Sequence, residues 1–232
     1  MKKSDGFLLL CVALVAALFV FVPQAGAFYN QATASHPVVM SFFKFAILST
    51  LGEMIGLRIR RGVYVQKGFG VLPRMLIWGV LGVFIWGAMV VFKAGTLKLY
   101  ELLGAPQAAQ WFASEGFSWG KLCVAFSVSV LMNSFFAPVF MTFHKITDTH
   151  IQQTGGTLFG FFSTPIPVGK IIAGLDWKTQ WGFVFKKTIP LFWYPAHTLT
   201  FMLPSNYQVL FAAFLGVALG VILAIANNKR DN

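Results

Sequence analysis

The sequence predicts an all-α fold: a polytopic transmembrane helix bundle of about six spans, or five if the amino-terminal segment is cleaved. The chain has 232 residues, of which 57% are hydrophobic and only 11% are charged, a balance that soluble domains of this size do not reach. Its apolar residues also occur in blocks of about 20, the length that a helix needs to cross roughly 30 Å of hydrocarbon. A transmembrane barrel would instead alternate apolar and polar residues over strands of about ten residues.

The amino-terminal segment, residues 1–29, fits two interpretations. Lys2 and Lys3 precede an apolar core from Phe7 to Val22, which predicts an uncleaved span over about 7–27. The small residues of "QAGA" follow this core, and that pattern is typical of a secretory signal peptide with its cleavage site. In either case the transmembrane helix bundle is expected over residues 30–232.

Apolar blocks predict the further spans at 38–57, 73–95, 121–143, 181–203 and 207–226, with a weaker apolar stretch near 157–174. Pro37 and Pro73 stand at the starts of two spans, where the missing N–H costs nothing because first-turn donors have no helical partner. Kinks are expected where prolines fall inside apolar runs, at Pro138, Pro190 and Pro195.

Basic residues are concentrated in every second connection between spans, and Lys229 and Arg230 follow the last one. By the positive-inside rule this pattern predicts that both termini are cytoplasmic. The net charge of +11 then needs no nucleic-acid partner, because each basic cluster flanks a span. A basic start without an Arg-rich amphipathic presequence favours a bacterial cytoplasmic (inner) membrane over an organelle.

Glu53 is an acid inside the apolar segment 44–61. An ionised carboxylate at membrane depth is costly unless a partner, water or protonation relieves it. Lys44 cannot be that partner within the helix, because it lies about 14 Å away along the axis and on the opposite face. Either Glu53 lines a polar cavity or pore, or it lies near the cytoplasmic edge and is neutralised by Arg58 or Arg60.

Glycine pairs at four-residue spacing occur in the second and the last span, at Gly52 and Gly56 and at Gly216 and Gly220. Small residues at this spacing let helices approach closely, which predicts helix-packing faces.

Asn133 and His197 are further polar residues within predicted spans. Asn133 shares a helical face with Ser129, so it either lines a channel or forms hydrogen bonds to another helix. His197 is either a metal ligand or a structural residue, and a lone histidine is more often structural. We include Glu53, Lys44, Asn133 and His197 as candidates for a pore or polar cavity.

The sequence predicts neither a metal site nor an enzyme. His144 and Asp148 share a face but His150 does not, and no third ligand is evident, which favours an interfacial polar cap. Motifs for zinc hydrolysis, a nucleophile elbow or a phosphate loop are missing from the sequence, so no catalytic residue and no cofactor are expected.

Four stretches carry a family resemblance. They are His36-Pro37, Gly52-Glu53, Arg74 with the following "WGVLGVFIWG", and "DWKTQWGFVFKKTIPLFWYPAHTLTFMLP". In these the chain, over about residues 35–226, resembles the family of the twenty-two-kilodalton peroxisomal membrane protein and the mitochondrial inner-membrane Mpv-seventeen protein. It departs where the family carries Gln and Asn between two prolines and an Arg after the second, since His197 and Thr200 lie in that interval here and Gln208 follows it.

Members of that family are regarded as pore-forming or metabolite-passing proteins, so the resemblance implies a pore-facing Glu53 that admits cations or tunes selectivity. We therefore expect an integral membrane channel or small-solute conduit in the lipid bilayer, passing a small solute or ion. Two alternatives stay open: a non-conducting membrane interaction or assembly protein, and a substrate-binding subunit of a transporter. A homo-oligomer is compatible with each. Glu53 is expected to face the bundle interior, toward the helix over Pro190–Pro204.

Overall fold

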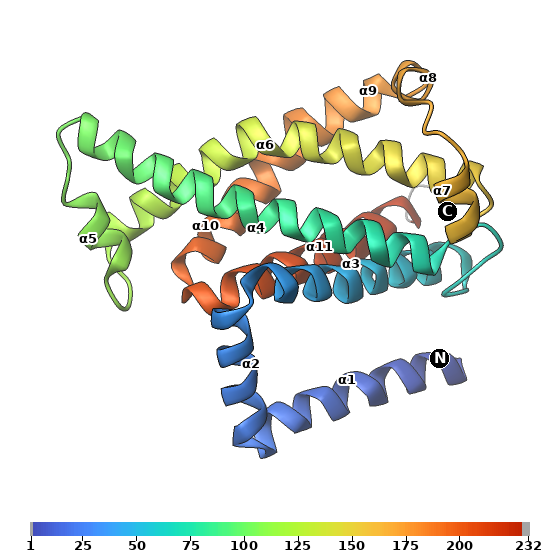
Figure 1. Ribbon diagram of the computed structural model, residues 1–232, viewed down its shortest axis with the longest axis horizontal. Coiled ribbons are helices and arrows are strands. Elements are labelled where there is room, and N and C mark those ends of the chain that lie inside the picture. Colours follow the sequence, from blue (N-terminus) through green and yellow to red (C-terminus); the bar gives the residue numbers. More distant parts are fainter. Residues whose placement is uncertain (1, 229–232) are drawn as a thin grey trace. The chain divides into compact units, whose positions relative to one another are not determined.

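The computed structural model describes residues 2–228, with side chains described to Ile225, and this part of the chain is helical without any strand (Figure 1). The all-α fold class is thereby confirmed. Met1, Lys229 and Arg230 lie outside the described residues. Helix contacts divide the chain into a first compact unit up to Met40 and a second from Ser41, whereas the sequence predicts the boundary after residue 29.

The first unit contains α1 (Lys3–Phe21), α2 (Pro23–Ser35) and the start of α3. α1 has no buried residue, and its large apolar side chains are exposed, as expected of a helix whose solvent is lipid. Val22 is extended, with φ −118° and ψ 90°, because a following proline disfavours helical geometry. The predicted span over 7–27 is therefore divided at Val22 into two helices.

Four long helices frame the second unit: α3 (Pro37–Arg61), α4 (Val71–Leu102), α6 (Trp119–Gln153) and α11 (Ser205–Asn228). With α1 they make five helices, within the described residues, that are long and apolar enough to cross a membrane. The 32 residues of α4 and the 35 of α6 correspond to about 48 and 52 Å, so both extend beyond a hydrocarbon layer of roughly 30 Å. The chain is a multi-pass membrane protein.

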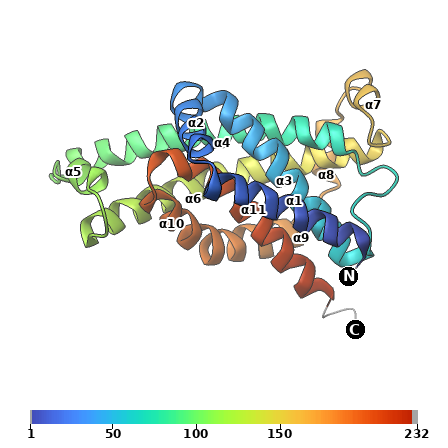
Figure 2. The same ribbon diagram turned by 90° about the horizontal axis from the view of Figure 1, so that it is seen from below.

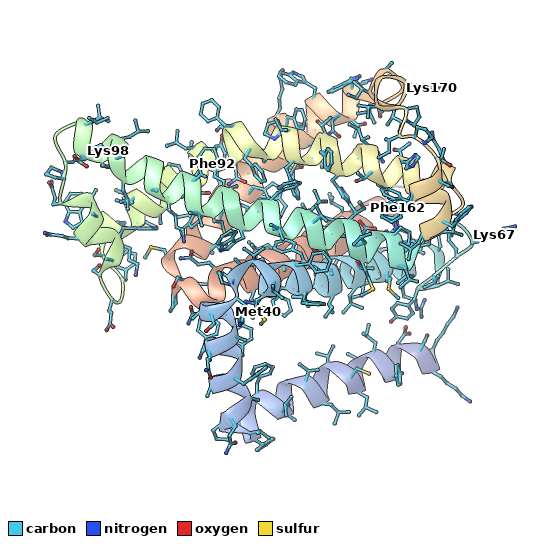
Figure 3. The ribbon with its side chains drawn as sticks, viewed as in Figure 1. Met40, Lys67, Phe92, Lys98, Phe162 and Lys170 are labelled. Atoms are coloured by element: carbon cyan, nitrogen blue, oxygen red, sulfur yellow. The ribbon has the colours of Figure 1, made fainter. Side chains whose placement is uncertain are left out.

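Short helices lie at the two ends of the α4–α6 pair (Figures 1 and 2). α5 (Ala108–Ala113) contacts both helices at one end, and α7 (Leu158–Ser163) contacts both at the other, where α8 (Val168–Ala173) contacts α6. The weaker apolar stretch near 157–174 thus forms two helices too short to span a membrane. Figure 3 shows Lys98 near the α5 end and Lys67 at the opposite end.

The predicted span over 181–203 is helical but not one regular helix. α9 (Trp177–Thr179) leads into a π-helical segment, η1 (Gln180–Trp193), which continues as α10 (Tyr194–Met202). Pro190 lies within η1 and Pro195 in the first turn of α10, so the irregular geometry falls where kinks are expected. Nothing in the surrounding sequence explains the length of η1. α6, by contrast, runs through Pro138 as one continuous helix.

The core of the second unit joins α3, α4, α6, α10 and α11 through buried apolar side chains that include Phe45, Met89, Val128 and Phe201. α3 and α4 are in close contact at Gly82. A Cβ added there would lie 2.5 Å from the Phe45 Cβ and 2.7 Å from the Ser41 carbonyl oxygen. Only glycine fits this contact without a shift of the backbone.

The loop between α3 and α4 turns the chain back so that the two helices are antiparallel neighbours. Gly70 ends this loop with φ +73°, and a Cβ there would lie 2.6 Å from the Ile151 Cγ2 and 2.9 Å from the Gly156 Cα. Both constraints favour glycine, which can adopt positive φ without strain. The loop is thereby held against the end of α6, and the first turn of α4 lies beside the last turns of α3.

Candidate functional site

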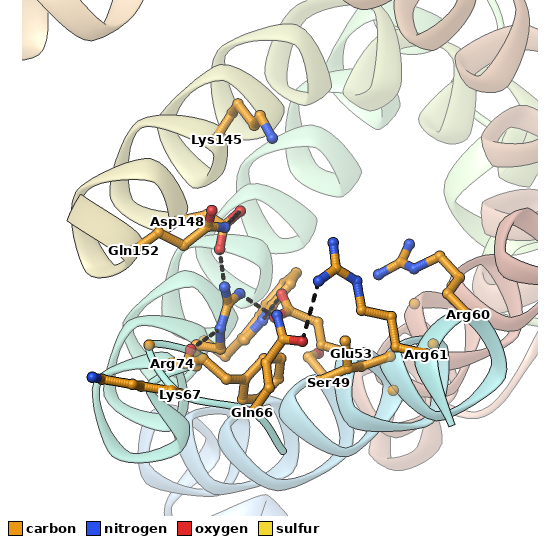
Figure 4. Close-up of a pocket in the computed structure, with 18 residues that line it drawn as sticks. Ser49, Glu53, Arg60, Arg61, Gln66, Lys67, Arg74, Lys145, Asp148 and Gln152 are labelled. Carbon is orange, nitrogen blue, oxygen red and sulfur yellow. Dashed lines mark hydrogen bonds and ion pairs between the residues drawn. The ribbon is translucent and has the colours of Figure 1, made fainter. Parts of the chain in front are cut away.

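A cavity of about 660 Å³ lies where α3, α4, α6, α11 and the α3–α4 loop meet. Figure 4 draws its lining residues. We call it the basic cavity because cations predominate among its charged lining residues, which are Glu53, Arg60, Arg61, Lys67, Arg74, Lys145 and Asp148.

Arg74 links three helices at the floor of this cavity. It lies in the first turn of α4, and its guanidinium forms ion pairs with Glu53 of α3 and Asp148 of α6. Its Nε also donates a hydrogen bond to the Phe69 carbonyl oxygen at 2.6 Å, and the guanidinium lies 4.6 Å from the centre of the Phe69 ring. Only 6% of the Arg74 side chain is exposed, so its charge is satisfied by fixed partners more than by solvent.

Glu53 has two further partners that hold its carboxylate in place. The Trp78 Nε1–H donates to its Oε1 at 2.8 Å, and the His144 Nε2 lies 3.3 Å from the same oxygen. The Trp78 and His144 rings are in contact, with centroids 4.4 Å apart. Glu53 therefore lines a polar cavity and is neutralised by a cation, which combines the two interpretations of this residue. The cation is Arg74 rather than Arg58 or Arg60.

The orientation of Glu53 differs from expectation in one respect. It faces the bundle interior, but its partners Arg74, Trp78 and His144 lie on α4 and α6, not on the Pro190–Pro204 helix. The antiparallel α3–α4 pairing accounts for this, because it sets the first turns of α4 against the carboxyl-terminal half of α3.

The basic cavity carries a surplus of positive charge. Five cationic side chains and two carboxylates line it, which leaves three positive charges in excess. Both carboxylates are ion-paired to Arg74. A cavity of one charge sign with low-dielectric walls concentrates ions of the opposite sign.

A second cavity, of about 810 Å³, lies between α4, α6, the α5–α6 loop and the α10–α11 connection. The Lys93 Nζ donates to the Gln208 Oε1 at 3.1 Å, and the Lys121 Nζ donates to the Ser114 carbonyl oxygen at 2.6 Å. Gln208 in turn donates to the Leu203 carbonyl oxygen. Polar and charged groups thus line this cavity as well.

The two cavities enter the bundle from opposite ends of the same helices. α4 contributes Trp78 to the basic cavity and Lys93 to the second cavity, positions about 22 Å apart along the axis. α6 contributes Lys145 and Lys121 in the same way, about 36 Å apart.

Buried apolar residues of α3, α4 and α11 lie between the cavities. We call this set the apolar barrier. Its members are at most 8% exposed and belong to one contiguous cluster: Phe45, Ile85, Met89, Val209, Ala212 and Ala213. On α4 and α11 these residues lie in sequence between those that line the basic cavity and those that line the second cavity. Phe45 of α3 packs against them. The barrier thus lies between two cavities that each have charged lining residues.

Asn133 and His197 form a buried network that joins α6 to α10, away from both cavities. The His197 Nδ1 lies 3.0 Å from the Asn133 Oδ1, and the Asn133 Nδ2 donates to the Ser129 carbonyl oxygen at 2.8 Å. The Ser129 hydroxyl donates to the Tyr194 carbonyl oxygen at 2.8 Å, where η1 changes into α10. Asn133 therefore forms hydrogen bonds to another helix and does not line either cavity.

The four glycines meet where α3 and α11 pack together, beside the basic cavity. A Cβ on Gly52 would lie 3.0 Å from the Val217 Cα, and one on Gly56 would lie 3.7 Å from the Gly220 carbonyl oxygen. Gly216 lies opposite Ser49. Lys44 is 7% exposed and lines neither of the two cavities.

His144, Asp148 and His150 have separate partners. The first two contact Glu53 and Arg74 in the cluster described above, whereas the His150 Nε2 lies 3.1 Å from the Phe161 carbonyl oxygen. His150 thus holds α7 against α6.

Sequence reasoning did not identify Arg74, Trp78 and His144 as partners of Glu53. One signal was present. If the second and third spans form an antiparallel hairpin, a cation just inside the third span lies level with an acid two turns before the end of the second.

Comparisons with protein-family models, with curated proteins and with solved structures give no match to this chain.

Proposed function

We propose that this chain is a small-solute conduit across a membrane and that the structure represents a closed state. The observation that carries the proposal is the pair of cavities with charged lining residues at opposite ends of α4 and α6, separated by the apolar barrier. Short apolar constrictions close channels because water leaves them, and a modest separation of the helices rehydrates them.

The proposal includes an orientation and a location. We place the basic cavity on the cytoplasmic side of a bacterial inner membrane with both termini inside, because Arg60, Arg61, Lys67 and Lys145 gather at that end. No catalytic activity and no nucleic-acid partner are part of it. A homo-oligomer is compatible with it, and its stoichiometry follows from light scattering of the purified protein.

We also propose membership of the peroxisomal and mitochondrial family named above. The positions that support it are structurally prominent here. Pro37 begins α3, Glu53 and Arg74 form an ion pair, and the terminal motif covers α9, η1 and α10.

The test is conduction by the purified full chain in planar bilayers. Wild-type protein should show rare openings, and Met89→Ala and Met89→Gln should increase them, the first by creating space and the second by making the barrier wettable at nearly constant volume. The matched control is Val139→Ala on α6. Val139 is 69% exposed, so removing its apolar atoms should leave the current unchanged.

Two results would count against the proposal. If every variant is silent over a wide range of voltage and pH, the non-conducting interaction or assembly protein becomes the better explanation. If Val139→Ala opens the protein as much as the Met89 variants do, the current reflects loosened packing and the barrier has no special role.

A further inference from the structure

The charge surplus of the basic cavity is carried by side chains that face a common space. In Figure 4 the guanidinium groups of Arg60 and Arg61 and the ammonium group of Lys145 point into the open part of the cavity, whereas the Lys67 ammonium group points away from it. Within residues 2–228, no carboxylate forms an ion pair with Arg60, Arg61 or Lys145. The Arg61 Nη1 donates a hydrogen bond to the Gln66 Oε1 at 3.4 Å, which uses one of the five N–H donors of a guanidinium group. Three cations from two helices are therefore available to a ligand.

Arg74 and the two carboxylates carry one net negative charge, which reduces the surplus of the other four cations to three but does not remove it. The guanidinium of Arg74 is already shared between Glu53 and Asp148, and one of these acids also accepts a hydrogen bond from Trp78. Arg74, Glu53 and Asp148 thus satisfy one another's charges. A cation that enters the cavity would find both carboxylates already paired, whereas an anion would meet Arg60 and Arg61.

Stabilisation of α3 is a simpler role for Arg60 and Arg61. Both lie in its last turn, where cations interact favourably with the helix dipole. That role does not explain why Lys145, on another helix, faces the same space. It also does not explain the cavity of about 660 Å³ between them, a volume within the range of small-ligand sites.

We propose that the basic cavity binds a phosphate-type oxyanion through Arg60, Arg61 and Lys145, so that the conduit takes phosphate-bearing solutes rather than cations. Guanidinium groups suit this chemistry because their N–H donors match the oxygens of phosphate in pairs. The substrate class rests on the proposed function, whereas the binding site can be measured without it. The phosphate belongs either to a soluble solute or to the headgroup of an anionic lipid.

The first experiment measures binding to the full chain purified in a zwitterionic detergent. Isothermal titration with inorganic pyrophosphate supplies a soluble phosphate. Native mass spectrometry with added phosphatidylglycerol supplies a lipid phosphate. The double variant R60Q/R61Q should weaken the binding of pyrophosphate about tenfold or more, because two charge-assisted contacts are lost. K145Q should weaken it less, and Glu53→Gln should strengthen it by removing a negative charge from the wall.

Lys187→Gln is the matched control, because it removes an exposed charge on η1 that lines neither described cavity. It should bind pyrophosphate as wild type does. Lys67→Gln removes a lining charge that points away from the open space, so it should weaken binding less than K145Q does. Circular dichroism and size-exclusion chromatography establish whether each variant is folded. If R60Q/R61Q is not folded, K145Q tests the site independently.

Each outcome decides something. Loss of pyrophosphate binding in R60Q/R61Q alone supports a soluble ligand. A second outcome is that wild-type protein binds phosphatidylglycerol but not pyrophosphate, and that R60Q/R61Q no longer binds the lipid. This outcome supports a lipid headgroup at the same site. Equal weakening in Lys187→Gln means general surface attraction and overturns the site, as does no binding of either probe.

Reversal potentials in asymmetric salt separate this inference from the proposed function. An anion-selective current whose selectivity falls in R60Q/R61Q supports both. A cation-selective current without phosphate binding retains the conduit and overturns the site. Binding without any current retains the site and overturns the conduit.

Discussion

Arg74→Gln would leave two carboxylates of the basic cavity without the cation that they share. The Arg74 side chain is 6% exposed, and those of Glu53 and Asp148 are 22% and 14% exposed. Breaking a fully buried ion pair by removing one partner costs about 3–5 kcal/mol. Because both carboxylates retain some contact with solvent, we expect a loss of about 2–3 kcal/mol in the free energy of unfolding.

The assay is unfolding by SDS in mixed micelles, followed by far-ultraviolet circular dichroism. Arg61→Gln, which removes an exposed cation from the same cavity, should change the free energy of unfolding by no more than about 0.5 kcal/mol. Adding Glu53→Gln and Asp148→Asn to Arg74→Gln removes the unpaired charges. This triple variant should recover to within about 1 kcal/mol of wild type.

Two results would refute this reasoning. If Arg74→Gln is as stable as wild type, the two ion pairs are solvated enough to contribute nothing. If the triple variant is less stable than Arg74→Gln, the neutral hydrogen bonds and packing of Arg74 matter more than its charge.

Three further predictions concern other parts of the fold. Gly82→Ala should destabilise the protein by about 1–3 kcal/mol through overpacking against α3, whereas Gly87→Ala, where an added Cβ meets nothing within 4 Å, should not; equal effects in SDS unfolding would contradict this. Asn133→Leu removes the acceptor for the buried histidine of α10 and should cost about 1 kcal/mol, and a double-mutant cycle with that histidine should give a non-zero coupling energy. Hydrogen bonds from the Thr179 hydroxyl and amide hold the pKa of Asp176 below its usual value, so this cap of α9 is present above about pH 4 and is lost as the pH falls through the lowered pKa. The protection of amides in the first turn of α9 against hydrogen exchange, relative to their intrinsic exchange rate at each pH, should fall only in that acidic range. A fall in protection near neutrality would exclude the cap as its cause.

Hydrophobic length predicted the long helices well because a membrane span and a continuous apolar block are nearly the same thing. Each of the four long helices of the second unit contains its predicted span and extends past it, since polar ends such as Arg58–Arg61 remain helical outside an apolar window. The errors fall at prolines. Pro23 divides the first apolar block although its hydropathy is continuous, and a π-helix at Pro190 depends on backbone hydrogen bonds that composition does not record.

Of the four candidates for a pore or polar cavity, only Glu53 lines the basic cavity. Glu53 was identified from cost alone, because an acid in an apolar helix needs a partner. The identity of that partner depends on the length of the α3–α4 loop and on the positive φ of Gly70, which set the register of two antiparallel helices. Lys44 and Asn133 were grouped with Glu53 because they share its membrane depth, but depth does not specify the direction in which a side chain points.

The ion pairs of Arg74 lie at one end of α4, so a small rotation of the helix about this end displaces residues farther along it by several ångströms. Met89, in the apolar barrier, follows Arg74 by fifteen residues, about 22 Å along the helix. If α4 rotates by about 10° with Arg74 as its pivot, Met89 moves by about 4 Å, more than the diameter of a water molecule. A contact that shifts hardly at all can therefore admit or exclude water several turns away, and the length of the lever arm is set by the spacing of two residues along a single helix.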